Sequence, residues 1–150
     1  MSIFFADTSA LAKRYVPEVG SAWVQSWMDP ASGHVTIISA LSTVEFISLL
    51  ARRQREGSVT AADLNRLRLD FLFHVRQQYR LIALRRDVLV QAQQLVVKHP
   101  LRTLDALQLA SAQIAANVIG TFPAFVTADR KLLAVATLEG FPTDDPNAHP

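Results

Sequence analysis

The sequence contains no cysteine and only five glycines among its 150 residues. The absence of cysteine excludes a thiolate nucleophile, a disulfide framework and a cysteine-ligated zinc site. The few glycines form neither a GxGxxG nor a Walker pattern, which argues against chemistry that depends on a bound nucleotide. The four histidines show no HExxH or other paired metal spacing, so a histidine-based metal site is not indicated either.

Long apolar runs are also missing. The longest ones fall far short of the ~20 residues that a membrane-spanning helix needs. Residues 1–7 lack the basic start and the longer apolar stretch of a signal peptide. Together with the lack of cysteine, these features predict a cytoplasmic protein that does not contact the membrane.

The composition favours a folded domain with a slight excess of positive charge. Half of the residues are hydrophobic and 19% are charged, which is enough for a core and fits a single domain over residues 1–150. The net charge is +2 and the pI is about 9.4. If four of the 13 acidic residues surround metal ions, the remaining nine face 15 basic residues, which suits a polyanionic substrate.

Short apolar runs alternate with longer amphipathic ones along the chain. Because the expected strands lack period-2 alternation and are separated by helices, they indicate an α/β fold whose parallel sheet is covered on both faces. In such a sheet the chemistry lies at the carboxyl ends of the strands. Strands are expected at 3–6, 34–37, 81–84 and 124–127, and helices at 9–15, 20–28, 39–55, from a cap at Thr60 onward, at 88–98 with Asp87 as its cap, at 103–118 and at 130–136.

Four carboxylates lie where such a site is expected. Asp7 directly follows the first strand, and Asp129 lies two residues beyond the strand that ends at Thr127. Glu45 and Asp105 lie in apolar helical stretches, where a carboxylate is seldom buried unless it is paired or binds a metal. Mg²⁺ and Mn²⁺ prefer carboxylate oxygens, and two such ions about 3.5–4 Å apart can hydrolyse a phosphodiester. A single ion with a bridging carboxylate could do part of this work.

Each of these acids also has a purely structural interpretation. Asp7 and Asp129 are placed to cap the helices that follow them, and Asp105 suits the first turn of its helix. Glu45 could pair with Arg52 or Arg53. The metal-site interpretation is favoured for the set, because the structural interpretations require four independent coincidences.

The segments around these acids resemble the motifs of the PIN-domain nucleases, and especially of the VapC-type toxins of toxin–antitoxin pairs. Residues 5–11 (FADTSAL) look like the first motif and residues 42–46 (STVEF) like the second. Residues 101–110 (LRTLDALQLA) are the most specific match, and residues 125–132 (FVTADRKL) look like the last motif. The resemblance implies that Asp7, Glu45 and Asp105 are the principal metal ligands and catalytic acids. It makes Asp129 a fourth acid, with the hydroxyls of Thr127 and Ser9 as candidate aids to the metal or to water.

The resemblance covers nearly the whole chain, in the right order and spacing. It implies a three-layer α/β/α PIN-like fold with a small, mainly parallel sheet of four to five strands. It also implies an endoribonuclease that depends on Mg²⁺ or Mn²⁺, in which a metal-bound water attacks phosphorus without a covalent enzyme intermediate. The implied partners are the RNA substrate, a second copy of the chain in a homodimer, and a VapB-like antitoxin that inhibits by occupying the active-site groove.

Basic residues follow several of the candidate ligands closely. Arg52 and Arg53 come after Glu45 on the same expected helix, Lys13 follows Asp7, and Arg130 directly follows Asp129. These four side chains are candidates to contact an RNA backbone. For the two arginines on the helix, a solvated helix end is the simpler interpretation, because cations are favoured near a helix C-terminus.

Two other functions compete with the nuclease. One is a phosphoacceptor signalling domain, which also places an aspartate after a parallel strand and binds Mg²⁺. That class needs adjacent acids after its first strand, whereas Asp7 stands alone, and it would leave Glu45 and Asp105 without a role. The other is a PIN-like module that binds RNA or acts as a scaffold without catalysis, against which the presence of all four acids argues.

Overall fold

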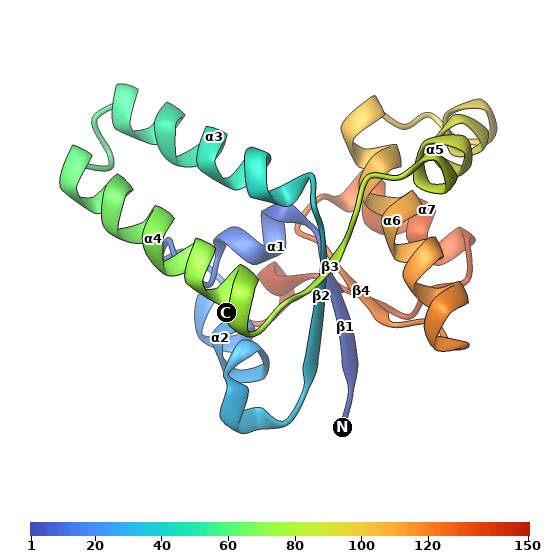
Figure 1. Ribbon diagram of the computed structural model, residues 1–150, viewed down its shortest axis with the longest axis horizontal. Coiled ribbons are helices and arrows are strands. Elements are labelled where there is room, and N and C mark those ends of the chain that lie inside the picture. The colour runs from blue at the N-terminus through green and yellow to red at the C-terminus, as the bar shows by residue number, and fades with distance from the viewer.

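The computed structural model describes residues 1–150 as a five-stranded sheet between two groups of helices (Figure 1). The strand order is β3-β2-β1-β4-β5, and every neighbouring pair is parallel. The expected α/β class and the parallel sheet are therefore confirmed. The strands are β1 (Ile3–Ala6), β2 (Val35–Ser39), β3 (Arg80–Ile82), β4 (Ala124–Val126) and β5 (Thr143–Asp144).

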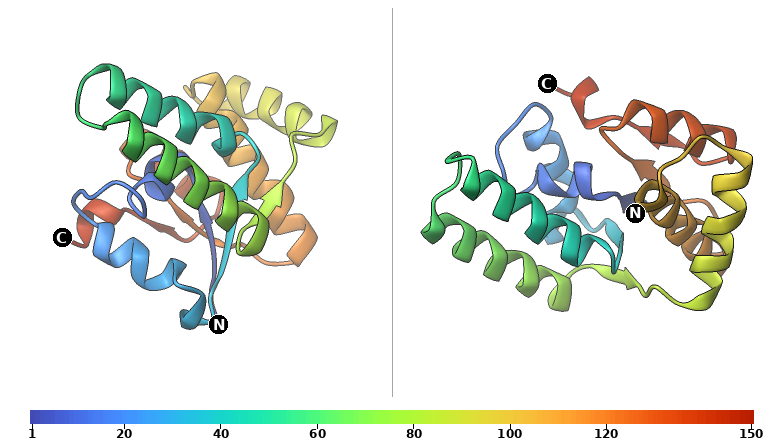
Figure 2. Two further views of the ribbon diagram at one scale, coloured as in Figure 1. Left: turned by 60° about the vertical axis from the view of Figure 1, so that its left-hand side comes forward. Right: turned by 90° about the horizontal axis from the view of Figure 1, so that it is seen from above.

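Seven α-helices connect the strands and form the outer two layers. The first four helices pack on one side of the sheet and the last three on the other, which confirms the three-layer arrangement. The antiparallel pair α3 and α4 extends away from the sheet (Figure 2). The helices are α1 (Thr8–Ala12), α2 (Ser21–Met28), α3 (Ser42–Arg55), α4 (Ala61–Gln77), α5 (Arg86–Lys98), α6 (Thr103–Ile119) and α7 (Arg130–Leu138).

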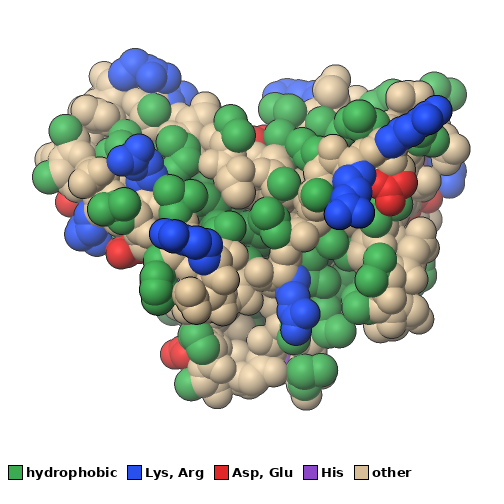
Figure 3. Space-filling view, in the orientation of Figure 1, with side chains coloured by type: hydrophobic (Ala, Val, Ile, Leu, Met, Phe, Trp, Pro, Cys, Tyr) green, Lys and Arg blue, Asp and Glu red, His purple; other side chains and the backbone are tan.

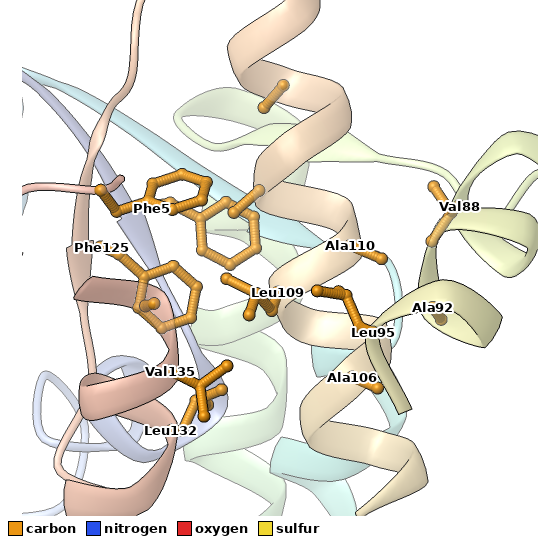
Figure 4. Packing of buried hydrophobic residues seen from close by; sticks show 14 of the residues in the cluster. Phe5, Val88, Ala92, Leu95, Ala106, Leu109, Ala110, Phe125, Leu132 and Val135 are labelled. Carbon is orange, nitrogen blue, oxygen red and sulfur yellow. The ribbon is translucent and has the colours of Figure 1, made fainter. Parts of the chain in front are cut away.

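Alternate strand residues build a separate core on each face of the sheet. Phe5 of β1 and Phe125 of β4 are register partners whose rings stack at a centroid distance of 5.4 Å. Leu109 of α6 and Leu132 of α7 close over these rings (Figure 4). Burial of aromatic and aliphatic surface here fixes α6 and α7 against the sheet, and thereby fixes where the N-terminal turn of α6 lies.

The opposite face of the sheet packs against α1 to α4. Ala6 and Val126, one residue further along β1 and β4, belong to this second core. Small side chains on the strands let α1 approach closely, and Phe46 of α3 packs edge-on to Phe71 of α4 with ring centroids 4.8 Å apart. The core on this side therefore holds α3 in place, and with it the acid in its first turn.

Several expected element boundaries are corrected by the backbone. The sequence predicts that a helix begins at Ser39, but Ser39 ends β2 and the helix starts at Ser42. Asp87 is expected to cap the helix that follows it, but Arg85 holds the cap position and Asp87 lies in the first turn. The carboxylate of Asp87 accepts a hydrogen bond from its neighbour's backbone amide instead, at 2.9 Å. None of the helices is both long enough and apolar enough to cross a membrane.

The fifth strand and the residues after it are expected from the sequence only as a polar tail. Thr143 pairs with Phe125 at the edge of the sheet. Beyond it, a 3₁₀ turn (Pro146–Ala148) packs against the loop before α2, where a Cβ on Gly20 would lie only 2.2 Å from the Pro146 carbonyl oxygen. Gly20 also has a φ of +86°, so both its backbone conformation and its contact require glycine.

Comparison of two glycine substitutions separates these two requirements. Gly57 has a similar φ of +82°, but a Cβ added there would have no neighbouring atom within 4 Å. We expect Gly57→Ala to lower the free energy of unfolding by about 1 kcal/mol, which is the cost of the left-handed backbone. Gly20→Ala should cost about 1 kcal/mol more, because the Pro146 carbonyl must move as well. Urea unfolding measures both values, and equal losses would show that the contact with Pro146 is unimportant for stability.

Candidate active site

Four acidic residues lie at the carboxyl edge of the sheet. Asp7 directly follows β1, and Asp129 lies three residues beyond the end of β4. Glu45 and Asp105 both lie in the first turns of the helices α3 and α6. In the space-filling view an indentation separates the α3–α4 lobe from the α5–α6 lobe, and an acidic side chain is visible within it (Figure 3).

Asp7 is the most deeply buried of the four, with 5% of its surface exposed. Its Oδ1 accepts hydrogen bonds from the Ser9 hydroxyl at 2.7 Å and from the Ala10 amide at 3.0 Å. Its Oδ2 accepts from the Thr127 hydroxyl, also at 2.7 Å. Burial raises the pKa of Asp7 to about 6 even though these hydrogen bonds lower it, and the nearby charge of Asp105 raises it further.

Asp105 is electrostatically coupled to the other three acids. Burial raises its pKa first, and the charges of Asp129 and Glu45 add to that effect, while Arg102 opposes it. None of the four acids forms an ion pair with a basic side chain, since every salt bridge in the structure involves other carboxylates. The structure therefore brings the four acids into one region of negative charge that no side-chain cation neutralises in a direct pair.

Asp129 is connected to Asp7 through the two expected hydroxyl residues. The hydroxyl of Thr127 donates a hydrogen bond to Asp7 and accepts one from the backbone amide of Asp129 at 3.0 Å. The hydroxyl of Ser9 also donates a hydrogen bond to Asp7, and it accepts one from the backbone amide of Ala128 at 2.9 Å. Thr127 and Ser9 thus hold the loop after β4 close to the end of β1. Their role toward a metal or water remains a prediction.

Two polar side chains hold Glu45, and a third contacts both of them; the motif segments contain all three residues, but none was among the candidate site residues. Its Oε1 accepts a hydrogen bond from the hydroxyl of Thr8 at 2.9 Å and from the amide nitrogen of Gln108 at 2.8 Å. Ser42 lies within hydrogen-bond distance of both donors. A usable signal existed for Gln108, because a glutamine three residues after Asp105 shares its face in an otherwise apolar stretch from Leu104 to Ala110.

The structural interpretations of the acids are partly confirmed. Asp7 caps α1 and Asp129 caps α7 through backbone amides, while Asp105 lies in the first turn of α6. The alternative of an ion pair between Glu45 and Arg52 or Arg53 is wrong, because Glu45 forms no salt bridge and Arg53 pairs with Glu18 at 3.5 Å. A cap uses only part of a carboxylate, so capping does not exclude a second role. Asp129, for example, caps with Oδ1 alone.

The candidate RNA-contacting residues differ in their accessibility. The expectation is wrong for Lys13, which is 3% exposed and donates to Glu18, to the Val19 carbonyl oxygen and to Asn147. Arg52 and Arg130 are exposed and form no ion pair, whereas Arg53 is partly engaged by Glu18. Arg102, absent from the expected set, is exposed and close enough to Asp105 to lower its pKa.

The oxygens that face this region fit a hard divalent cation. No protein group donates a hydrogen bond to Oε2 of Glu45, to the carboxylate of Asp105 or to Oδ2 of Asp129. No three acidic or histidine side chains converge closely enough to form a complete protein cage around an ion. Mg²⁺ does not need such a cage, because it usually keeps several waters and binds through one or two carboxylates. The donor set therefore fits Mg²⁺ or Mn²⁺ with water as a co-ligand.

A surface cavity of about 610 Å³ lies elsewhere. It is lined mainly by polar residues of α5, of the C-terminal half of α6 and the turn after it, and by Glu139, and it contains none of the four acids. Cavity size alone would therefore point away from the carboxylates. We place the candidate site at the carboxylates, because charge coupling and free oxygen ligands are specific to them.

Comparison with known families decides the classification of the chain. Residues 4–138 match the family model described as the PIN domain, and this matched range contains all four acids. The chain belongs to the PIN-domain family. This assignment leaves the alternative of a phosphoacceptor signalling domain without support.

Individual relatives of this PIN domain agree with the family assignment. The chain is 31% identical over 148 residues to Ribonuclease VapC47 of Mycobacterium tuberculosis (strain CDC 1551 / Oshkosh), covering 97% of this chain and 98% of that protein. Among solved structures, the toxin-antitoxin complex from Klebsiella pneumoniae superposes with a TM-score of 0.61 at 18% identity, over 97% of this chain and 98% of that chain. Mycobacterium tuberculosis VapC20, a Sarcin-Ricin loop cleaving toxin, gives a TM-score of 0.64 at 18% identity, over 92% and 95%.

The raised pKa of Asp7 predicts that this acid destabilises the metal-free PIN domain. Because the folded-state pKa of about 6 exceeds the ordinary value of 3.8, the native state binds the proton more tightly. Stability should therefore fall as pH rises from 4 to 6 and stay low above that range. Asp7→Asn removes the charge, and the Thr127 hydroxyl can turn to accept from the new amide. We expect this variant to be about 2 kcal/mol more stable at pH 7.5.

Thermal unfolding in EDTA measures this gain as an increase in Tm of roughly 5 °C. The same pair of proteins at pH 4 provides the control, because Asp7 is protonated there and the gain should disappear. A gain that is equal at both pH values, or a loss at pH 7.5, would contradict the proposed charge effect.

Proposed function

We propose that this PIN-domain protein is a toxin-type endoribonuclease that hydrolyses RNA phosphodiester bonds with the help of Mg²⁺ or Mn²⁺. The observation that carries the proposal is the group of four acids at the carboxyl edge of the sheet, in which Asp105 is electrostatically coupled to the other three and none has a basic ion-pair partner. Such an arrangement is costly unless a cation is bound during function. The identity of 31% with a protein named as a ribonuclease supports the choice of substrate.

Asp7, Glu45 and Asp105 would hold the cation, either directly or through waters that the cation keeps, with Asp129 assisting. When bound, the cation would activate water and stabilise charge on the phosphodiester oxygens. The residues of the chain arrange this site. Thr127 and Ser9 fix the carboxylate of Asp7 from two sides, and the loop they hold brings Asp129 near.

An RNA backbone fits the surface around the indentation. Arg102 lies beside Asp105, and Arg130 is exposed in the first turn of α7, which begins at the same edge of the sheet. Arg52 is also exposed, but it lies in the last turn of α3, farther from the acids. Basic side chains are visible on both lobes (Figure 3). Cations placed around an acidic centre would attract phosphates while leaving the acids free for the metal.

Control by an antitoxin is part of the same proposal. The related Klebsiella pneumoniae structure is a toxin-antitoxin complex, which supports a protein partner for this chain. We infer that a VapB-like antitoxin covers the acidic indentation and so blocks access of RNA. A homodimer also stays a prediction, for which exposed apolar side chains on α4, Leu69 and Phe73, offer a contact surface.

Cleavage of RNA by the purified protein should depend on both the cation and Glu45. We expect activity with Mg²⁺ or Mn²⁺, none with EDTA, and a loss of roughly 100-fold or more in Glu45→Gln, because loss of a ligand removes several kcal/mol of transition-state stabilisation. Glu56→Gln is the matched control. Glu56 lies at the other end of α3 and is exposed, so its variant should cleave at the wild-type rate.

Gel analysis of labelled RNA distinguishes the remaining outcomes. Activity that persists in Glu45→Gln would indicate a contaminating nuclease or a misplaced site. If no RNA is cleaved and calorimetry detects no metal binding, the protein is better described as a non-catalytic RNA-binding or scaffold module.

The toxin role makes a separate prediction in cells. Induced expression of the wild-type chain in a bacterial host should stop growth within a few generations, whereas Glu45→Gln at the same expression level should not. Growth is followed by optical density, and protein levels are matched by immunoblotting. Equal growth of both cultures, with active ribonuclease recovered from the wild-type cells, would separate the enzymatic activity from a toxin role.

A further inference from the structure

Gln108 is a buried amide in an apolar part of α6. It lies one turn after Asp105, is only 3% exposed, and is followed by Leu109 and Ala110 in the core. Its Nε2 lies 2.8 Å from Oε1 of Glu45, 3.0 Å from the Ser42 hydroxyl and 3.2 Å from the Thr8 hydroxyl. One side chain of α6 thus contacts polar atoms of both α1 and α3.

The orientation of the Gln108 amide follows from these partners. With Nε2 toward Glu45, the amide donates to a carboxylate oxygen. If the amide were reversed, two acceptor oxygens would face each other. In the observed orientation Oε1 of Gln108 is buried and has no hydrogen-bond donor. A buried acceptor without a donor destabilises the fold, so packing alone would favour an apolar residue here.

The hydrogen bonds to Glu45 are unequally divided between its two oxygens. Oε1 accepts from both Gln108 and Thr8, whereas no protein group donates to Oε2. Two donors on one oxygen fix the plane and the rotation of the carboxylate. The second oxygen then remains available at the acidic edge of the site.

We propose that Gln108 is a positioning residue, which fixes Glu45 through Oε1 so that Oε2 can bind a divalent cation. The proposal rests on the metal-dependent function proposed above. Hydrogen-bond partners of ligating carboxylates commonly orient them and strengthen metal binding. Gln108 connects two candidate ligands, because it lies on the same helix as Asp105 and donates a hydrogen bond to Glu45 on α3. It therefore sets the relative position of two ligands that lie on opposite lobes.

The test is the affinity for Mn²⁺, measured by isothermal titration calorimetry on the full chain without RNA. Gln108→Met keeps the length and helix preference of glutamine but cannot donate a hydrogen bond. We expect it to bind Mn²⁺ about tenfold more weakly than wild type. Gln113→Met is the matched control on the same helix, because the amide of Gln113 accepts from Gln91 on the side away from the acids. This control should bind Mn²⁺ with wild-type affinity.

A crystal structure of metal-free Gln108→Met provides a readout that does not depend on binding. The proposal expects the Glu45 carboxylate to leave its present position, with Oε1 no longer fixed from the α6 side. Thr8→Val, which removes the other donor to the same oxygen, should also weaken Mn²⁺ binding. It serves as the second variant if Gln108→Met does not fold.

Each outcome tests either the positioning role of Gln108 or the metal-dependent function on which that role rests. Unchanged Mn²⁺ affinity in Gln108→Met, with weakened affinity in Glu45→Gln, overturns the positioning role but keeps the metal site. Weaker binding with Glu45 unmoved also overturns it, because Gln108 would then act by another route. If wild type binds no Mn²⁺, or if Glu45→Gln binds as well as wild type, the proposed metal site itself is wrong.

Discussion

Five parallel strands must be joined by crossovers, and this constraint determines where everything else in the molecule lies. All five strands run in the same direction, so the chain leaves every strand on the side of the sheet where the carboxyl ends of the strands lie. The helices α1, α3 and α7 follow β1, β2 and β4 directly and direct their N-terminal turns toward the same region. Helix α6 follows α5, and its first turn also lies there, since Asp105 is close enough to Glu45 and Asp129 for their charges to raise its pKa in addition to burial. An acid placed after a strand or in a first helical turn consequently reaches a common centre, although the acids are up to 122 positions apart in the sequence from Asp7 to Asp129.

The same geometry explains why so much negative charge can be tolerated. Asp7 and Asp129 satisfy helix amides, and Asp105 and Glu45 lie at helix N-termini, where the backbone dipole favours a negative charge. Burial raises the pKa of Asp7 most, and the charge of Asp105 raises it further, so these contacts reduce the repulsion but do not remove it. Structural and functional interpretations of these acids are thus complementary. The caps hold each carboxylate in place, and the remaining repulsion is what a bound cation would relieve.

Local signals in the sequence are sufficient for the sheet direction, the two-sided core and the positions of the four acids. An acid after an apolar strand, or within an apolar helical stretch, can be recognised from a few neighbouring residues. Features that depend on distant partners cannot be recognised in this way. Lys13 resembles a surface cation, but its partner Asn147 is 134 positions away. The two-residue strand β5 is defined only by its pairing with β4. Thr8, Ser42 and Gln108 carry no charge to mark them, and only the assembled fold shows that they meet at Glu45.

The buried ammonium of Lys13 has a consequence for sequence variation within the family. Its partners are a carboxylate and a carbonyl oxygen from the segment before α2 and an amide oxygen from the C-terminal 3₁₀ turn. A relative with a shorter C-terminus, or with an apolar residue at position 147, would leave this cation without one of its acceptors. Positions 13 and 147 should therefore covary among relatives, with lysine retained at 13 where an oxygen-bearing side chain occupies 147.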